Sequence, residues 1–161
     1  MANDVFDYRH GYSIGAGAVV VCGAKVLLVR LLQGEGQGEW AIPGGFVEPE
    51  ETIDQAVHRE LWEETGVKAD LKGLIAARSR VSSNENSAYF VFLMHATNED
   101  TRADGLEVAE ARYFTLAQVQ SLSRLRALSR IVVTRVLEGK VNLLEFHPHP
   151  EFPPSEFVLY V

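Results

Sequence analysis

Cysteine, long apolar stretches and positive charge are all scarce in this sequence. Cys22 is the one cysteine, which excludes an internal disulfide framework and fits a reducing compartment. The N-terminal residues lack the apolar core of a signal peptide. No apolar run approaches the roughly 20 residues that a membrane-spanning helix needs, so we expect a cytoplasmic protein without a membrane partner.

Acidic residues outnumber basic ones. The 161 residues include 15 Lys and Arg against 22 Asp and Glu, for a formal net charge of −7 and an isoelectric point near 5.2. This balance argues against broad binding to nucleic-acid backbones, so we expect no nucleic-acid partner. A phosphate group can still be bound locally, through a metal ion and a few arginines.

Internal repeats, low-complexity tracts and an interdomain linker are absent as well. The 47% of apolar residues is enough to build a core. We therefore predict one domain over residues 1–161, in which residues 141–161 form a Pro-rich C-terminal tail. The apolar residues of that tail are expected to pack on the same domain or on a second subunit, which would make a homodimer.

Residues 40–67 are the most informative stretch. They open as a short apolar strand, break at a pair of glycines and then enter a helical run. Thr52 with Gln55 forms a capping box, which predicts that the helix begins at or just after Thr52. Gly66 follows the last helical residue and suits the left-handed conformation that ends helices. One face of this helix is apolar and consists of Ile53, Ala56, Val57 and Leu61.

Three glutamates form a second cluster on the same helix. Glu60, Glu63 and Glu64 are spaced i, i+3, i+4, so their side chains are neighbours and repel one another. A hard divalent cation such as Mg²⁺ or Mn²⁺ prefers carboxylate oxygens and would neutralise them. Taken alone, the three residues also fit an ordinary solvated acidic face.

The spacing of residues on both sides of these glutamates favours the metal site over the solvated acidic face. Gly45, Glu51 and residues 59–67 follow the pattern G-x5-E-x7-R-E-U-x-E-E-x-G-U, in which U is aliphatic. At all nine restricted positions the sequence resembles the signature of the Nudix hydrolase family. The resemblance implies an α/β fold, a Nudix-type α/β/α sandwich around a mixed β-sheet, with Mg²⁺ (or Mn²⁺) as cofactor.

The same resemblance implies which residues hold the metal. In such enzymes the carboxylates at the positions of Glu60, Glu63 and Glu64 are the ligands. The carbonyl of the preceding glycine, here Gly44, often joins them. These four residues are therefore our candidate metal ligands within the motif. The three glutamates are also our candidate catalytic residues.

A further acidic group commonly comes from outside the motif, as a metal ligand or as the base for the attacking water. Relatives often read Glu-x-x-Glu-x-x-Trp in this region, and Tyr113 stands at the expected tryptophan position. This alignment points first to Glu107 and second to Glu110. The alternative is that both are ordinary surface charges of an acidic protein.

Glu51 and Arg59 occupy the remaining charged positions of the motif. In relatives this pair usually braces the loop against the helix. Arg59 is therefore also a candidate residue of the catalytic site. We expect it to support the site rather than to take part in the chemistry. One departure is visible, because Pro49-Glu50-Glu51 stands where relatives often have Pro-Gly-Glu. Glu50 in place of glycine is expected to alter the turn of this loop, but no metal-ligand position is lost.

Four residues outside the motif helix are candidates for substrate binding. Arg30 ends a strand and is either a phosphate contact or an exposed charge. Arg78 and Arg80 flank a bend and either hold a diphosphate or ribose, or are solvated strand ends. Trp40 either stacks on a base or packs in the core.

The rest of the chain alternates between strands and helices. Two β-branched runs, Gly15–Cys22 and Lys25–Leu31, predict a hairpin. Residues 33–39 are glycine-rich and polar, which predicts a loop beside the site. Residues 69–79 are expected to form a strand pair or one long bent strand. Further expected elements are strands over 89–96 and 106–114, a loop over 81–87, and helices over 116–122 and 125–137.

The substrate is the least defined part of the prediction. We favour a small-molecule nucleotide, namely a nucleoside diphosphate linked to another moiety such as ADP-ribose or a nucleotide sugar. A nucleoside triphosphate cut to the monophosphate is the first alternative. A non-catalytic nucleotide-binding regulator usually has a damaged motif. An isoprenoid diphosphate isomerase would need a catalytic cysteine in a loop, whereas Cys22 lies in a strand-like run.

Overall fold

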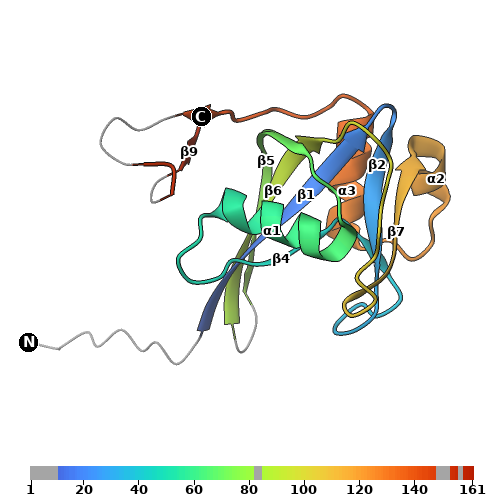
Figure 1. Cartoon of the computed structure of the whole chain (residues 1–161), viewed down its shortest axis with the longest axis horizontal. Helices are drawn as coiled ribbons and strands as arrows, with labels where there is room; N and C mark the ends of the chain where they lie inside the picture. Colours follow the sequence, from blue (N-terminus) through green and yellow to red (C-terminus); the bar gives the residue numbers. More distant parts are fainter. Residues whose placement is uncertain (1–10, 82–84, 148–152, 156–157) are drawn as a thin grey trace, which may run out of the picture.

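The structure, a computed structural model, describes residues 11–81, 85–147, 153–155 and 158–161. Pro148 and Pro150 of the predicted tail lie outside the described residues. In chain order the elements shown in Figure 1 are β1 (Gly11–Cys22), β2 (Lys25–Leu31), β3 (Trp40–Ala41), β4 (Gly44–Phe46), α1 (Ile53–Thr65), β5 (Asp70–Val81), β6 (Glu85–His95), β7 (Val108–Thr115), α2 (Leu116–Ser121), α3 (Ala127–Leu137), β8 (Phe146–His147) and β9 (Leu159–Tyr160).

Seven of the described strands form one mixed sheet. Its order is β3-β2-β1-β6-β5, with β4 paired to β1 and β7 paired to β2. β1 runs parallel to β6 and antiparallel to its other neighbours. β1 and β2 pair next to their hairpin, at Val21 and Cys22, whereas β4 pairs with the middle of β1, at residues 15–17. This topology brings the glycine pair of β4 against β1 just before the chain enters α1.

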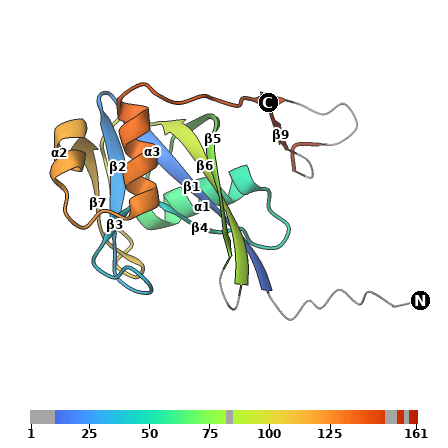
Figure 2. The ribbon, with the colours of Figure 1, turned by 180° about the vertical axis from the view of Figure 1, so that it is seen from behind.

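Helices cover both faces of the sheet. Figures 1 and 2 show α1 on one face and α2 with α3 on the other. Successive side chains of β1 alternate between the two sides, so that Ala18 and Val20 join the core under α1 while Val19 joins the core under α2 and α3. The chain therefore forms the predicted α/β/α sandwich around a mixed sheet. Among the described helices, none is long and apolar enough to cross a membrane.

Both ends of α1 agree with the local sequence signals. The N-cap residue is Thr52, whose backbone N–H donates to the side chain of Gln55 at 2.8 Å. Gly66 ends the helix with a φ of 65°, and its N–H donates to the carbonyl of Trp62. The predicted apolar face is confirmed as well, because its central residues Ala56, Val57 and Leu61 are buried.

The described part of the C-terminal tail packs on the same domain. Leu144 exchanges two backbone hydrogen bonds with Leu74 of β5. Tyr160 of β9 packs edge-on against Phe92 of the α1-side core, with ring centroids 5.3 Å apart. The sequence left two alternatives open for the tail, namely packing on the same domain or on a second subunit. The described contacts are of the first kind.

Two segments differ from the sequence prediction. The loop predicted over 81–87 is wrong at both ends, because β5 continues to Val81 and β6 begins at Glu85. The helix predicted from Leu125 begins at Ala127 instead. Residues 124–126 lie beside β3, where the N–H of Arg126 donates to the carbonyl of Trp40.

Candidate active site

Glu64 is a buried carboxylate near the end of α1. It is 5% exposed, and its Oε2 accepts a hydrogen bond from the N–H of Gly44 at 2.9 Å. The pKa of Glu64 is raised to about 8, chiefly by burial and further by the charges of Glu60, Glu107 and Asp104, while the Gly44 hydrogen bond lowers it. A nearby cation would stabilise the ionised form of this group.

Glu60 lies one turn earlier, against the glycine pair. A Cβ at Gly45 would come within 2.4 Å of Glu60 Oε1, so glycine is required for the carboxylate to lie there. At Gly44, φ is 148° and a Cβ would meet the carbonyl oxygen of Ala16 at 2.3 Å. Burial raises the pKa of Glu60, while its hydrogen bond from Arg59 lowers it. The glycine pair thus lets the acidic side of α1 approach β4 and β1 closely.

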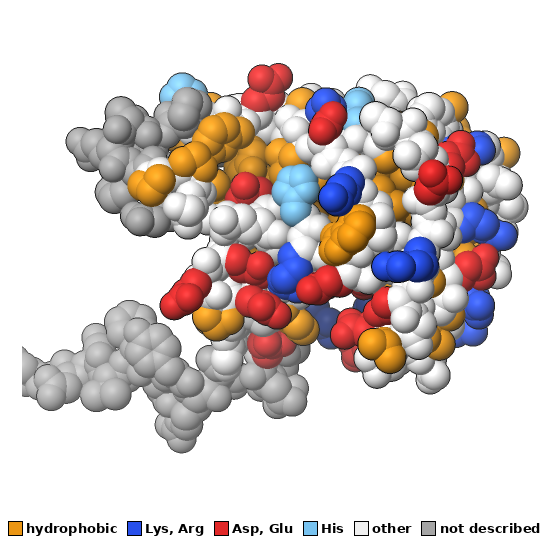
Figure 3. Space-filling model, in the orientation of Figure 1, with side chains coloured by type: hydrophobic (Ala, Val, Ile, Leu, Met, Phe, Trp, Pro, Cys, Tyr) orange, Lys and Arg blue, Asp and Glu red, His pale blue; other side chains and the backbone are white. Residues whose placement is uncertain are grey.

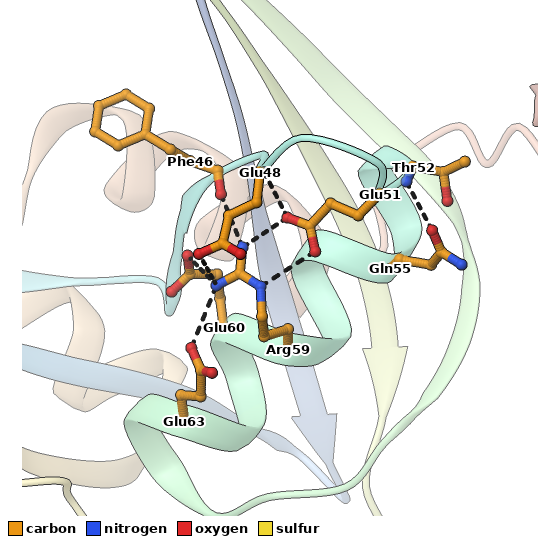
Figure 4. A network of polar contacts seen from close by, with 8 residues as sticks. All are labelled: Phe46, Glu48, Glu51, Thr52, Gln55, Arg59, Glu60 and Glu63. Atoms are coloured by element: carbon orange, nitrogen blue, oxygen red, sulfur yellow. Dashed lines mark hydrogen bonds and ion pairs between the residues drawn. The ribbon is translucent and has the colours of Figure 1, made fainter. Parts of the chain in front are cut away.

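Arg59 connects the loop before α1 to the glutamates of the helix. Its Nη2 donates to Glu51 Oε1 at 2.6 Å and to the carbonyl of Phe46 at 3.0 Å. Its Nη1 donates to Glu60 at 2.9 Å and to Glu63 at 3.2 Å. Figure 4 shows the guanidinium at the centre of this network, with the ring of Phe46 directed away from it. The hydrogen bond with Glu51 raises the pKa of Arg59 and lowers that of Glu51, so the pair is suited to the bracing role.

The two candidates for the additional acidic residue lie in different surroundings. Glu107 follows a turn in which the carboxylate of Asp104 accepts hydrogen bonds from three consecutive backbone N–H groups, including that of Glu107. Glu107 is close enough to Glu60 and Glu64 of α1 for its charge to raise the pKa values of both. Glu110 instead forms ion pairs with Arg30 at 3.4 Å and Arg112 at 3.6 Å. This placement favours Glu107, and it adds Asp104, which sequence reasoning misses, as the residue that positions it.

A pocket of about 550 Å³ adjoins the glycine pair. Its wall includes residues 44–46, the neighbouring ends of β1, β5 and β6, and the start of α3. Arg78 and Arg80, both predicted to bind substrate, line this pocket together with Arg126. The site therefore has an acidic side on α1 and a basic side in the pocket.

Tyr89 lies between these two groups of charge. Its ring covers Gly15 and Gly17 of β1, where a Cβ would come within 2.6 Å and 2.3 Å of Tyr89 atoms. Burial raises the pKa of Tyr89, the glutamates of α1 raise it further, and Arg78 and Arg126 lower it. One phenol is thus within electrostatic reach of both the carboxylates and the arginines, which shows how closely the pocket adjoins the acidic cluster.

Two other predicted substrate residues lie outside the pocket wall. Trp40 is 7% exposed and packs edge-on against Phe114 with ring centroids 4.9 Å apart, and the guanidinium of Arg112 lies 5.2 Å from its ring. The structure therefore gives Trp40 the core role rather than the base-stacking one. Arg30 is on β2, where it pairs with Glu110 of the neighbouring strand β7.

Sequence reasoning misses Arg126 as a pocket residue. No local pattern marks it, because it falls inside a run with helical periodicity. Its place at the pocket depends on the pairing of residues 124–126 with Trp40, which is distant in the sequence.

Comparison with known proteins identifies the family. The family model of the NUDIX domain matches residues 11–136. The chain belongs to the Nudix family. An ADP-ribose pyrophosphatase from Methanocaldococcus jannaschii is 33% identical over 101 residues, which cover 62% of this chain and 59% of that relative. The chain thus matches less than two thirds of the length of this curated Nudix relative.

Solved structures share the Nudix fold. A MutT Nudix hydrolase from Burkholderia pseudomallei superposes with a TM-score of 0.70 at 25% identity, over 79% of this chain and 99% of that one. A bifunctional NMN adenylyltransferase/ADP ribose pyrophosphatase from Francisella tularensis, solved with AMP and a Mn ion, gives a TM-score of 0.68 at 22% identity, over 81% of this chain and 42% of that one.

The donor chemistry of this Nudix site fits a hard divalent cation. Figure 3 shows acidic side chains gathered on the lower half of the face that carries α1. The candidate side chains offer only carboxylate oxygens. Burial, and to a lesser extent neighbouring carboxylates, raise the pKa values of Glu60 and Glu64, and a bound cation would favour their ionised forms. In the described part of the chain no three acidic, His or Cys side chains are already grouped to hold a metal ion. Arg59 donates hydrogen bonds to two of the carboxylates, Glu60 and Glu63.

Proposed function

We propose that this Nudix protein is a metal-dependent hydrolase that cleaves a diphosphate bond in a nucleoside diphosphate linked to another moiety, with ADP-ribose or a nucleotide sugar favoured. One observation carries the proposal. The buried Glu64 and the half-buried Glu60 of α1 meet the glycine pair of β4 at the edge of a pocket that is lined by arginines. Acidic groups suited to a cation and basic groups suited to phosphate thus lie side by side.

The chemistry follows from charge. A diphosphate resists hydrolysis because its anionic oxygens repel an incoming nucleophile. Mg²⁺ or Mn²⁺, held by Glu60, Glu63, Glu64 and Glu107 with the Gly44 carbonyl, would offset that charge and lower the pKa of the attacking water. Glu107 either completes the ligand set or accepts the proton of the water. Arg59 keeps the carboxylates and the loop in position through its hydrogen bonds.

The pocket supports a nucleotide substrate. Its volume of about 550 Å³ is in the range of small-molecule sites. Arg78 and Arg80 line the pocket, and we expect them to bind the phosphate groups because guanidinium groups match phosphate geometry. The preference for ADP-ribose draws on the M. jannaschii relative, which is an ADP-ribose pyrophosphatase.

A screen of nucleotides tests this function. The purified chain is incubated with ADP-ribose, nucleotide sugars and nucleoside triphosphates in Mg²⁺ or Mn²⁺, and the products are separated by chromatography. We expect AMP and ribose 5-phosphate from ADP-ribose, and no turnover in EDTA. Faster cleavage of triphosphates to monophosphate and pyrophosphate would support the first alternative instead. No turnover across the panel, with nucleotide binding retained, would favour a non-catalytic binding module.

A further inference from the structure

The three arginines of the pocket differ in what surrounds them. Arg78 Nη1 donates to Ser87 Oγ at 2.6 Å, and its guanidinium lies 5.6 Å from the ring centroid of Tyr89. Within the described ranges, no carboxylate forms an ion pair with Arg78. A guanidinium that is held by a hydroxyl and an aromatic ring is oriented for an anion.

Arg80 and Arg126 instead pair with acids from a single loop. Glu35 Oε2 lies 3.8 Å from Arg80 Nη1, and Glu39 Oε2 lies 3.8 Å from Arg126 Nε. Both glutamates belong to the glycine-rich loop, residues 33–39, that connects β2 to β3. Ion pairs of this length between exposed side chains are weak. A diphosphate group, which carries two negative charges, is therefore able to replace these carboxylates on the arginines.

The glycine-rich loop is anchored near its middle. Arg124 Nη2 donates to the carbonyl of Gln37 at 3.1 Å. Glu35 and Glu39 lie on either side of this anchor. Three alternate positions have positive φ and are glycines, namely Gly34 at 74°, Gly36 at 101° and Gly38 at 77°.

We propose that Glu35 and Glu39 are built-in competing anions for the pocket, and that Arg126 joins Arg78 and Arg80 in binding a phosphate group of the substrate. The substrate's identity rests on the proposed function, but the exchange of carboxylate for phosphate requires only an anionic ligand. Such a loop lowers the affinity of every ligand and discriminates against those with too little charge to displace it. It therefore favours a diphosphate over a neutral nucleoside.

Removing the competing charge tests the first part. Glu35→Gln combined with Glu39→Gln keeps the side-chain size and removes both negative charges. Calorimetric titration in EDTA, with ADP-ribose and inorganic pyrophosphate as separate probes, is expected to show affinity raised about threefold to tenfold. The matched control is Glu99→Gln with Glu138→Gln, which removes two carboxylates from surface ion pairs elsewhere and should leave affinity unchanged. Unchanged or weaker binding by the loop variant, or no binding of either probe to any of these proteins, would overturn the proposal.

Replacing the pocket arginine tests the second part. Arg126→Met should weaken both probes about tenfold and make binding less dependent on salt. Arg135→Met is the control, because it removes the same charge from the last turn of α3, outside the pocket wall and away from the loop, and it should change affinity less than about twofold. Equal losses in the two variants would take Arg126 out of the site. A chain that binds the probes in EDTA but hydrolyses no nucleotide would overturn the proposed function and leave this inference standing.

Discussion

The carboxylate cluster and the arginine pocket meet at the glycine pair of β4, but they are built differently. The cluster takes its side chains from α1 and the loop before it, with Glu107 as the one distant member. The pocket takes its arginines from β5 and from the segment before α3. Short contacts hold the cluster, such as Arg59 to Glu51 at 2.6 Å, whereas the ion pairs of Arg80 and Arg126 in the pocket are both 3.8 Å long.

Under the proposed function, this difference separates the groups that carry out the chemistry from those that recognise the substrate. Groups that stabilise a transition state act best when they are fixed in advance, which the Arg59 network provides. A recognition surface has to accept and release ligands, which weak and exchangeable ion pairs allow. We therefore expect variants of the cluster to change mainly kcat and variants of the pocket to change mainly KM.

The largest effect is expected from Glu64→Gln. The amide keeps an oxygen that can accept the Gly44 N–H but loses the charge suited to a cation, so kcat should fall about 10³-fold. Steady-state kinetics with Mg²⁺ measure this, and urea unfolding verifies that the variant is folded. Glu138→Gln, which removes a surface carboxylate at the far end of α3, is the control. Wild-type kcat in a folded Glu64→Gln protein would remove this residue from the site.

Double-mutant cycles compare how firmly the two regions are held. The Arg59–Glu51 pair is short and is 23% and 15% exposed, whereas the Arg80–Glu35 pair is long and is 58% and 83% exposed. With Met replacing Arg and Gln replacing Glu, urea unfolding should give coupling free energies of about 2 kcal/mol for the first pair and below about 0.5 kcal/mol for the second. Equal couplings would contradict the distinction between a braced cluster and an exchangeable pocket.

Arg78→Met tests the pocket by kinetics. Removing a guanidinium that is oriented by Ser87 and Tyr89 should raise KM about tenfold and change kcat less than about threefold. Arg135→Met, in the last turn of α3 and exposed, loses the same charge outside the pocket wall and should alter neither constant. A fall in kcat with constant KM would instead assign Arg78 to transition-state stabilisation.

The cluster could be predicted from the sequence because its determinants are local. Thr52, Gln55 and Gly66 mark the ends of α1, and the spacing of its residues sets which side chains share a face. The glutamates then follow from the helix without knowledge of the rest of the fold. Glu107 required more than local spacing, because it reaches the cluster through a turn that depends on Asp104.

The pocket could be predicted only in part, because distant segments assemble it. Arg126 reaches it through backbone pairing with Trp40, and no pattern within residues 125–137 reports that contact. The prediction of a loop over residues 81–87 is wrong for a related reason. Its strand ends are exposed or half-buried, so polar residues occur there without the apolar alternation that marks a strand.

Glu50→Gly is expected to have the smallest effect, and it compares the loops of the two regions. The glycine-rich loop at the pocket has glycine at its positive-φ positions, whereas Glu50 in the motif loop has a φ of 68°. A left-handed residue with a Cβ costs about 1–2 kcal/mol, and glycine returns about half of that as extra entropy of the unfolded chain. Calorimetry should therefore show Tm raised by about 1–4 °C with kcat unchanged. Glu50→Ala removes the same charge but keeps the Cβ, so an equal gain in that variant would assign the effect to charge and leave the backbone of the motif loop unstrained.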